Sequence, residues 1–95
     1  MSVSISDIPD QDRSDMLARL KRIEGQSRGI QKMIEDGREC TAILDQTASI
    51  RAALTALTGV MLESFALHCL ANSNEYPSPE RAIESMVRTI VRYGK

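Results

Sequence analysis

The chain contains one long apolar stretch, from about residue 38 to residue 70, that no proline interrupts. Apolar residues recur within it at the period of an α-helix. A helix of this length would be about 50 Å long. One partner helix from the same 95-residue chain cannot cover so long an amphipathic helix, so the pattern predicts self-association along it. The apolar stripe consists of Ile43, Thr47, Ile50, Leu54, Leu57, Met61 and Phe65.

A shorter helix is expected on each side of this stretch, which makes the fold all-α with three helices. Apolar residues recur at helical spacing over residues 14–36, and Gly37 is suited to end that helix. The last helix is expected over residues 79–93, with Ser78 as its cap and Pro79 in its first position. Very few aromatic residues and many Ala, Leu, Ile and Met residues also favour helices over sheets.

The first residues differ from the rest of the chain. Residues 1–12 are polar and lack an apolar period, so we expect a flexible N-terminal arm there and a single helical domain over residues 13–95. The N-terminus lacks the pattern of a signal peptide, and we find no apolar run that approaches the roughly 20 residues needed to span a bilayer. The expected location is the cytoplasm, with no membrane partner.

Charge is unevenly distributed along this chain of net charge −1. Between Arg13 and Lys32 there are six basic residues and two acidic ones, and further acidic residues flank this band on both sides. A basic band on a near-neutral protein is typical of a surface that contacts nucleic acid. The alternative is a mixed-charge helix face that is merely solvated.

The two cysteines, Cys40 and Cys69, lie near opposite ends of the long helix, 29 residues apart. That spacing corresponds to about 43 Å along the axis, so the two thiols cannot meet within one subunit. An antiparallel pair of these helices, with a two-fold axis passing between Leu54 and Thr55, would place Cys40 of one subunit opposite Cys69 of the other. In a reducing compartment a reactive or metal-binding role is favoured over a permanent disulfide, and the alternative is that both are ordinary core cysteines.

Four segments together resemble the CsoR/RcnR/FrmR family of bacterial repressors. The resemblance implies a three-helix protomer, an antiparallel four-helix-bundle dimer, assembly of two dimers into a tetramer, and release of operator DNA when an inducer occupies the interfacial site. It also implies that the chain is not an enzyme. The segments are LARLKRIEGQSRGI at 17–30, GREC at 37–40, IRAAL at 50–54 and LESFALHC at 62–69.

The branches of this family differ in the groups that bind the inducer. Copper sensors resemble this chain at both cysteines but carry histidine where it has Phe65, and nickel and cobalt sensors use further histidines that it lacks. Formaldehyde sensors rely on an N-terminal proline where this chain has Ser2. A cysteine pair without the histidine resembles the persulfide-sensing CstR-type branch, in which reactive sulfur species bridge the two thiols. The resemblance therefore implies a sulfur-sensing repressor with no cofactor, and Cys40, at a helix N-terminus that favours negative charge, is expected to be the attacking nucleophile.

Two alternatives to sulfur sensing remain open. Two thiolates could hold Cu(I) in a linear site, because soft sulfur ligands select that ion, which would make Cys40 and Cys69 metal ligands. The same helical dimer could also be a cytosolic thiol or copper buffer that does not bind DNA. His68 is the single histidine and adjoins Cys69, but a lone histidine on a helix is more often a surface residue than a ligand.

Operator DNA is the partner that the resemblance implies for the basic band. No helix-turn-helix is recognisable, so affinity is expected to come mainly from phosphate neutralisation and DNA shape, and to fall steeply with salt. The expected DNA-binding residues are Arg19, Lys21, Arg22, Arg28, Lys32 and Arg51.

Overall fold

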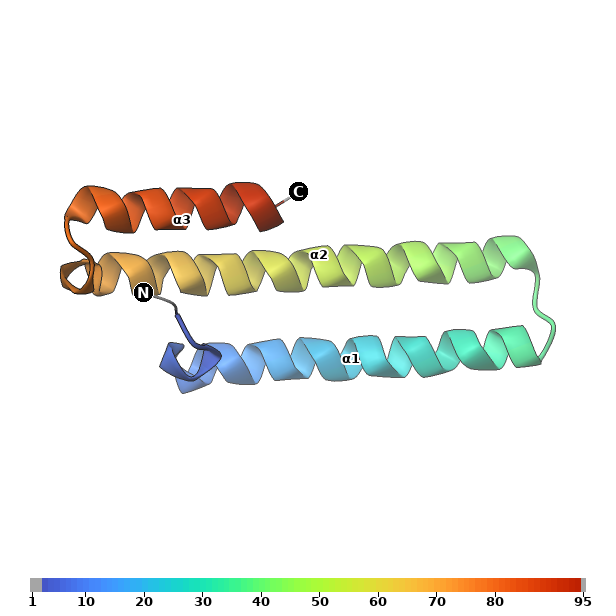
Figure 1. The fold of residues 1–95 in the computed structure, drawn as a ribbon. Coiled ribbons are helices and arrows are strands. Elements are labelled where there is room, and N and C mark those ends of the chain that lie inside the picture. The colour runs from blue at the N-terminus through green and yellow to red at the C-terminus, as the bar shows by residue number, and fades with distance from the viewer. Residues whose placement is uncertain (1–2, 95) are drawn as a thin grey trace.

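The computed structural model describes residues 3–94, which form three α-helices and, within that range, no strand. They are α1 (Asp10–Glu35), α2 (Cys40–Ala71) and α3 (Pro79–Tyr93), joined in that order as Figure 1 shows. Two short 3-10 helices precede α1 and α3, namely η1 (Ile5–Asp7) and η2 (Ser73–Glu75). The all-α, three-helix prediction is confirmed.

The ends of the helices follow from local chemistry. Gly37 has a φ of +68°, and its N–H donates to the carbonyl of Ile34 while the N–H of Arg38 donates to that of Met33. This is the Schellman arrangement, which needs a left-handed residue that glycine supplies without strain. At the start of α3, the Ser78 side chain accepts from a backbone N–H and proline occupies the first turn, as predicted.

The N-terminal segment is different from the flexible arm that we expected. Helix α1 begins at Asp10, four residues earlier than predicted, and the turn before it is closed by a capping box between Ser4 and Asp7. Ile8 is buried against Met16 and Leu57, so the segment packs onto α1 and α2. Val3 packs against the same cluster, but a few apolar residues in a short polar segment produce no helical period, which is why the sequence pattern missed this contact. The first two residues of the expected arm lie outside the described range.

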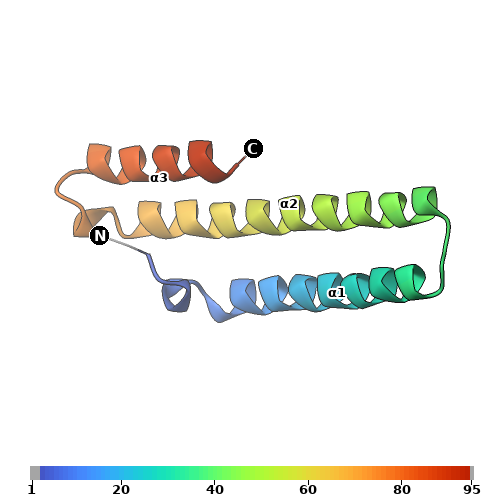
Figure 2. The same ribbon diagram turned by 45° about the vertical axis from the view of Figure 1, so that its right-hand side comes forward.

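The three helices lie side by side in a single layer. Helix α2 occupies the middle, with α1 along one side and α3 along the other, in both views (Figures 1 and 2). The described chain extends 57 × 25 × 14 Å, and its smallest dimension is close to the diameter of one helix, about 10–12 Å. Its radius of gyration of 17.5 Å exceeds the roughly 13 Å of a compact chain of this length. A single layer leaves two broad faces without a covering element.

The uncovered surface of α2 is apolar. Leu54 is 45 % exposed and Met61 is 37 % exposed, although both belong to the predicted apolar stripe. The expectation that no apolar run is long enough to span a membrane is wrong. By length and composition alone α2 would suffice, because an 18-residue window of it has a mean hydropathy of 1.5 and only 17 % of that window is buried. The same apolar surface of α2 is the property from which the sequence predicts self-association.

Candidate functional site

The two cysteines occupy opposite ends of α2 and differ in exposure. Cys40 is the first residue of the helix and is exposed, whereas Cys69 lies in its last turn and is 1 % exposed. Their spacing of 29 residues corresponds to eight full turns plus about 20°, so both lie on the same side of α2. One protomer therefore does not bring the thiols together, and it presents them on a common side, as an antiparallel pairing of two α2 helices requires.

Cys69 is buried and contacts the turn between α2 and α3 through Tyr76. Its Sγ lies 3.5 Å from the Tyr76 hydroxyl oxygen, at hydrogen-bond distance for sulfur. The contact with Cys69 raises the pKa of Tyr76 above its usual value, burial acts in the same direction, and the Ser85 hydroxyl opposes them. Sequence reasoning missed Tyr76, because no periodicity connects a residue in a turn with the helix residue that it folds back to contact.

The two residues that bear on a metal ligand set, Phe65 and His68, make contacts of other kinds. Phe65 is half-buried and lines a small hollow of ≈ 90 Å³ together with Ile8 and Met16, so it faces the N-terminal turn. The Nδ1 atom of His68 lies 3.3 Å from the side-chain amide nitrogen of Asn72. No cluster of three or more His, Cys, Asp or Glu side chains suited to a metal ion occurs among residues 3–94.

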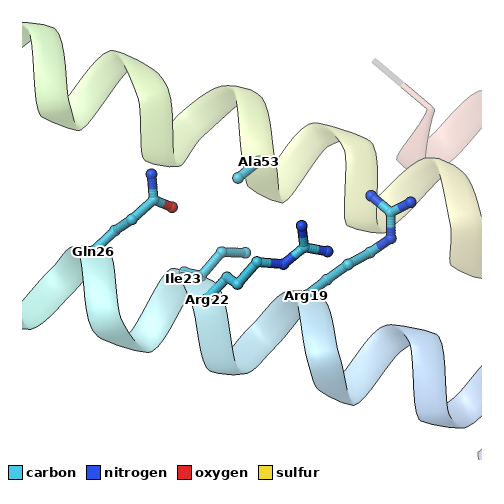
Figure 3. A pocket seen from close by; sticks show the side chains of 5 residues that line it. All are labelled: Arg19, Arg22, Ile23, Gln26 and Ala53. Atoms are coloured by element: carbon cyan, nitrogen blue, oxygen red, sulfur yellow. The ribbon is translucent and has the colours of Figure 1, made fainter.

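Two of the predicted DNA-binding residues line one groove between α1 and α2. Arg19 and Arg22 reach from α1 toward α2 and flank a space of ≈ 440 Å³ opposite the small side chain of Ala53 (Figure 3). Gln26 lines the same groove, and its side-chain amide donates to the Ser49 hydroxyl across the helices at 3.3 Å. Two guanidinium groups beside an amide make this groove suited to an oxyanion such as a phosphate.

The other predicted basic residues lie outside this groove. Arg28 is paired with Glu24 at 2.8 Å and Lys32 with Asp36 at 3.4 Å, each pair one turn apart on the outside of α1. Arg51 lines a separate hollow between α2 and the end of α3. Arg19 is itself paired with Asp15 at 3.0 Å, whereas Lys21, Arg22 and Arg51 form no ion pair within the described chain.

Comparison with known proteins identifies the family to which the chain is similar. Residues 12–92 match the family model described as a metal-sensitive transcriptional repressor. The copper-sensing transcriptional repressor CsoR of Bacillus subtilis (strain 168) is 37 % identical over 84 residues, which cover 88 % of this chain and 83 % of the relative. The family model and this relative describe transcriptional repressors and not enzymes, in agreement with the sequence prediction.

Solved structures show that the fold is shared as well. The copper-sensing repressor CsoR with Cu(I) from Geobacillus thermodenitrificans NG80-2 superimposes with a TM-score of 0.74 at 37 % identity, covering 100 % of this chain and 95 % of that one. The nickel-responsive transcriptional regulator InrS gives a TM-score of 0.73 at 26 % identity, covering 84 % and 90 %. The chain therefore belongs to the metal-sensitive transcriptional repressor family, as its resemblance to CsoR predicts.

Proposed function

We propose that this protein is a DNA-binding repressor that releases its operator in the cytoplasm when Cu(I) binds the thiolates of Cys40 of one subunit and Cys69 of another. The observation that carries this proposal is the position of both cysteines on one side of α2, 29 residues apart, in a chain that is 37 % identical to copper-sensing repressors. Repression would be lost because the ion links two subunits and favours a quaternary arrangement that fits DNA poorly.

The proposed site requires two copies of α2 to pair antiparallel in a four-helix-bundle dimer, two of which form the tetramer. Support comes from the single helical layer, which leaves Leu54 and Met61 exposed beside α1 and α3. A two-fold axis between Leu54 and Thr55 would cover these side chains and would bring each Cys40 opposite a Cys69 of the other subunit. Covering apolar surface contributes about 25 cal/mol per Å² toward association.

The donor set is compatible with Cu(I). Soft thiolate ligands select this ion, and two of them in a line satisfy it without a third ligand. A site of two ligands needs neither Phe65, which packs against apolar side chains, nor His68, which lies beside Asn72. Cys40, being exposed at the start of α2, would supply the accessible thiolate, and Cys69 would supply the enclosed one.

A reactive sulfur species is the second candidate effector, and the apolar surroundings of Phe65 favour it because they leave a site of two thiols alone. The Cys40 thiolate would attack the outer sulfur of a persulfide donor, which releases the donor thiolate and leaves a persulfide on Cys40. The Cys69 thiolate would then attack the inner sulfur and release hydrosulfide, so the two thiols are oxidised to an inter-subunit disulfide while the sulfane sulfur is reduced.

Mass spectrometry combined with operator binding distinguishes the two effectors. The reduced protein is exposed separately to Cu(I) and to a persulfide donor, and each sample is measured under native and denaturing conditions and for DNA affinity. We expect one Cu(I) for each cysteine pair, loss of operator binding and no covalent link. DNA release only after exposure to the persulfide, with a Cys40–Cys69 link between subunits, would instead establish a reactive sulfur species as the effector. Absence of DNA binding in the reduced protein would leave a thiol or copper buffer.

Operator DNA would lie against the basic residues of α1 and α2, with Arg22 in a leading role. Arg22 is exposed at the groove and has no acidic partner in the described structure, so its charge is available to a phosphate. The full set proposed to contact DNA is Arg19, Lys21, Arg22, Arg28, Lys32 and Arg51.

Arg22→Ala should weaken operator binding at least about tenfold and flatten its salt dependence. Each lost phosphate contact lowers the slope of log affinity against log salt by about 0.9, so a tetramer in which every Arg22 contacts a phosphate would lose about 3 to 4. Arg28→Ala is the comparison within the proposed set, and we expect a smaller loss there because Glu24 already pairs with that guanidinium. Fluorescence anisotropy over a range of salt concentrations measures both variants. Equal losses of slope would contradict a special role for the groove.

A further inference from the structure

The turn that covers Cys69 is held in place by a series of hydrogen bonds. The backbone N–H and the side-chain amide of Asn72 both donate to the His68 carbonyl, each at 3.0 Å. The N–H groups of Glu75 and Tyr76 donate to the carbonyls of Asn72 and Ser73 at 3.0 and 3.1 Å. The chain is thereby folded back over the last turn of α2, and the Tyr76 side chain reaches the sulfur of Cys69.

We propose that Tyr76 is a positioning residue for Cys69, whose hydroxyl holds the sulfur beneath the α2–α3 turn, so that an effector engages Cys69 only after this contact breaks. The inference rests on the proposed function, since it concerns one of the same two thiols. It makes the site asymmetric, with Cys40 open to solvent and Cys69 guarded. It also connects the Cys69 thiol with α3, because Tyr76 lies three residues before the first residue of that helix.

The energetic scale of the contact sets the expected effect. A neutral hydrogen bond contributes a net amount that corresponds to about a fivefold change in an equilibrium. Tyr76→Phe removes the hydroxyl and keeps the ring, whereas Tyr76→Ala removes both the hydrogen bond and the cover that the ring provides. Tyr93→Phe is a matched control, because it makes the same chemical change on an exposed tyrosine at the end of α3.

Competitive labelling of the two cysteines measures directly how much the Tyr76 contact protects Cys69. The reduced 95-residue protein is treated with iodoacetamide, which forms an S–C bond at each thiolate and releases iodide, and mass spectrometry quantifies both sites separately. We expect Cys40 to label first, Tyr76→Phe to raise the rate at Cys69 about fivefold with Cys40 unchanged, and Tyr76→Ala to raise it further. Tyr93→Phe should change neither rate. No change in Tyr76→Phe, or the same acceleration at both cysteines, would overturn the proposal.

Tyrosine fluorescence provides a signature that loosened packing alone would not reproduce. The chain has no Trp and two Tyr, so Tyr76 is the sole tyrosine in a Tyr93→Phe background. In that background Cys69→Ala should change the Tyr76 emission, and Cys40→Ala should not. Identical emission in both variants would show that the contact does not exist in solution. Neither experiment uses DNA, copper or a sulfur donor, so the proposed effector could be wrong while this inference stands, and the reverse also holds.

Discussion

Leu54→Lys should convert the assembled protein into 10.5 kDa protomers that no longer bind operator DNA. Leu54 is 45 % exposed in the protomer and lies beside the proposed two-fold axis, so its two copies would meet there. The substitution places two ammonium groups together in an apolar interface, one turn from the Arg51 of each helix. Burying an unpaired charge costs several kcal/mol, and about 4 kcal/mol raises a dissociation constant roughly a thousandfold.

Light scattering coupled to size-exclusion chromatography measures this change in mass, and Leu67→Lys is its control. Leu67 is also on α2 and is 58 % exposed, but it points about 140° away from Leu54 around the helix. This second variant should keep the mass and the operator affinity of the parent protein. A monomer from Leu67→Lys together with an intact oligomer from Leu54→Lys would place the interface on the opposite side of α2.

Cys40→Ala should give a repressor that binds its operator with affinity close to that of the parent protein and responds to neither effector. Cys40 lies at the exposed start of α2 and outside the basic groove, so its loss removes one of the two proposed ligands without touching the DNA surface. Anisotropy on labelled operator, with Cu(I) and a persulfide donor added in turn, measures the response. Full release of DNA from this variant would show that Cys40 is not part of the sensing site.

Mixing subunits tests whether the two thiols of one site come from different chains. Cys40→Ala and Cys69→Ala each destroy both sites of a homodimer, so neither variant alone should bind an effector at the pair. A mixed dimer of the two variants retains one Cys40 opposite one Cys69 and should regain half of the parent stoichiometry. If mixing restores nothing although subunits exchange, the antiparallel arrangement is wrong.

Much of the fold was predictable because it depends on residues close together in the chain. Gly37 ends α1 and Ser78 caps α3 through contacts with backbone groups a few residues away. The helical period likewise located α2 and placed its two cysteines at opposite ends. The start of α1 was missed because Asp10 follows Pro9, which provides no side-chain cap, and because the apolar residues that anchor the segment, Ile8 and Val3, show no helical period.

The amino-acid sequence by itself determined the helices, their approximate ends, the cysteine spacing and the family, since periodicity, capping and motif spacing are local properties of the chain. Only the tertiary structure decided that Ile8 packs on Leu57, that Arg22 shares a groove with Arg19 while Arg51 lies elsewhere, and that Tyr76 contacts Cys69. The physical reason is that each of these contacts depends on how whole helices and turns pack together, and packing of distant segments leaves no periodic signal in the sequence.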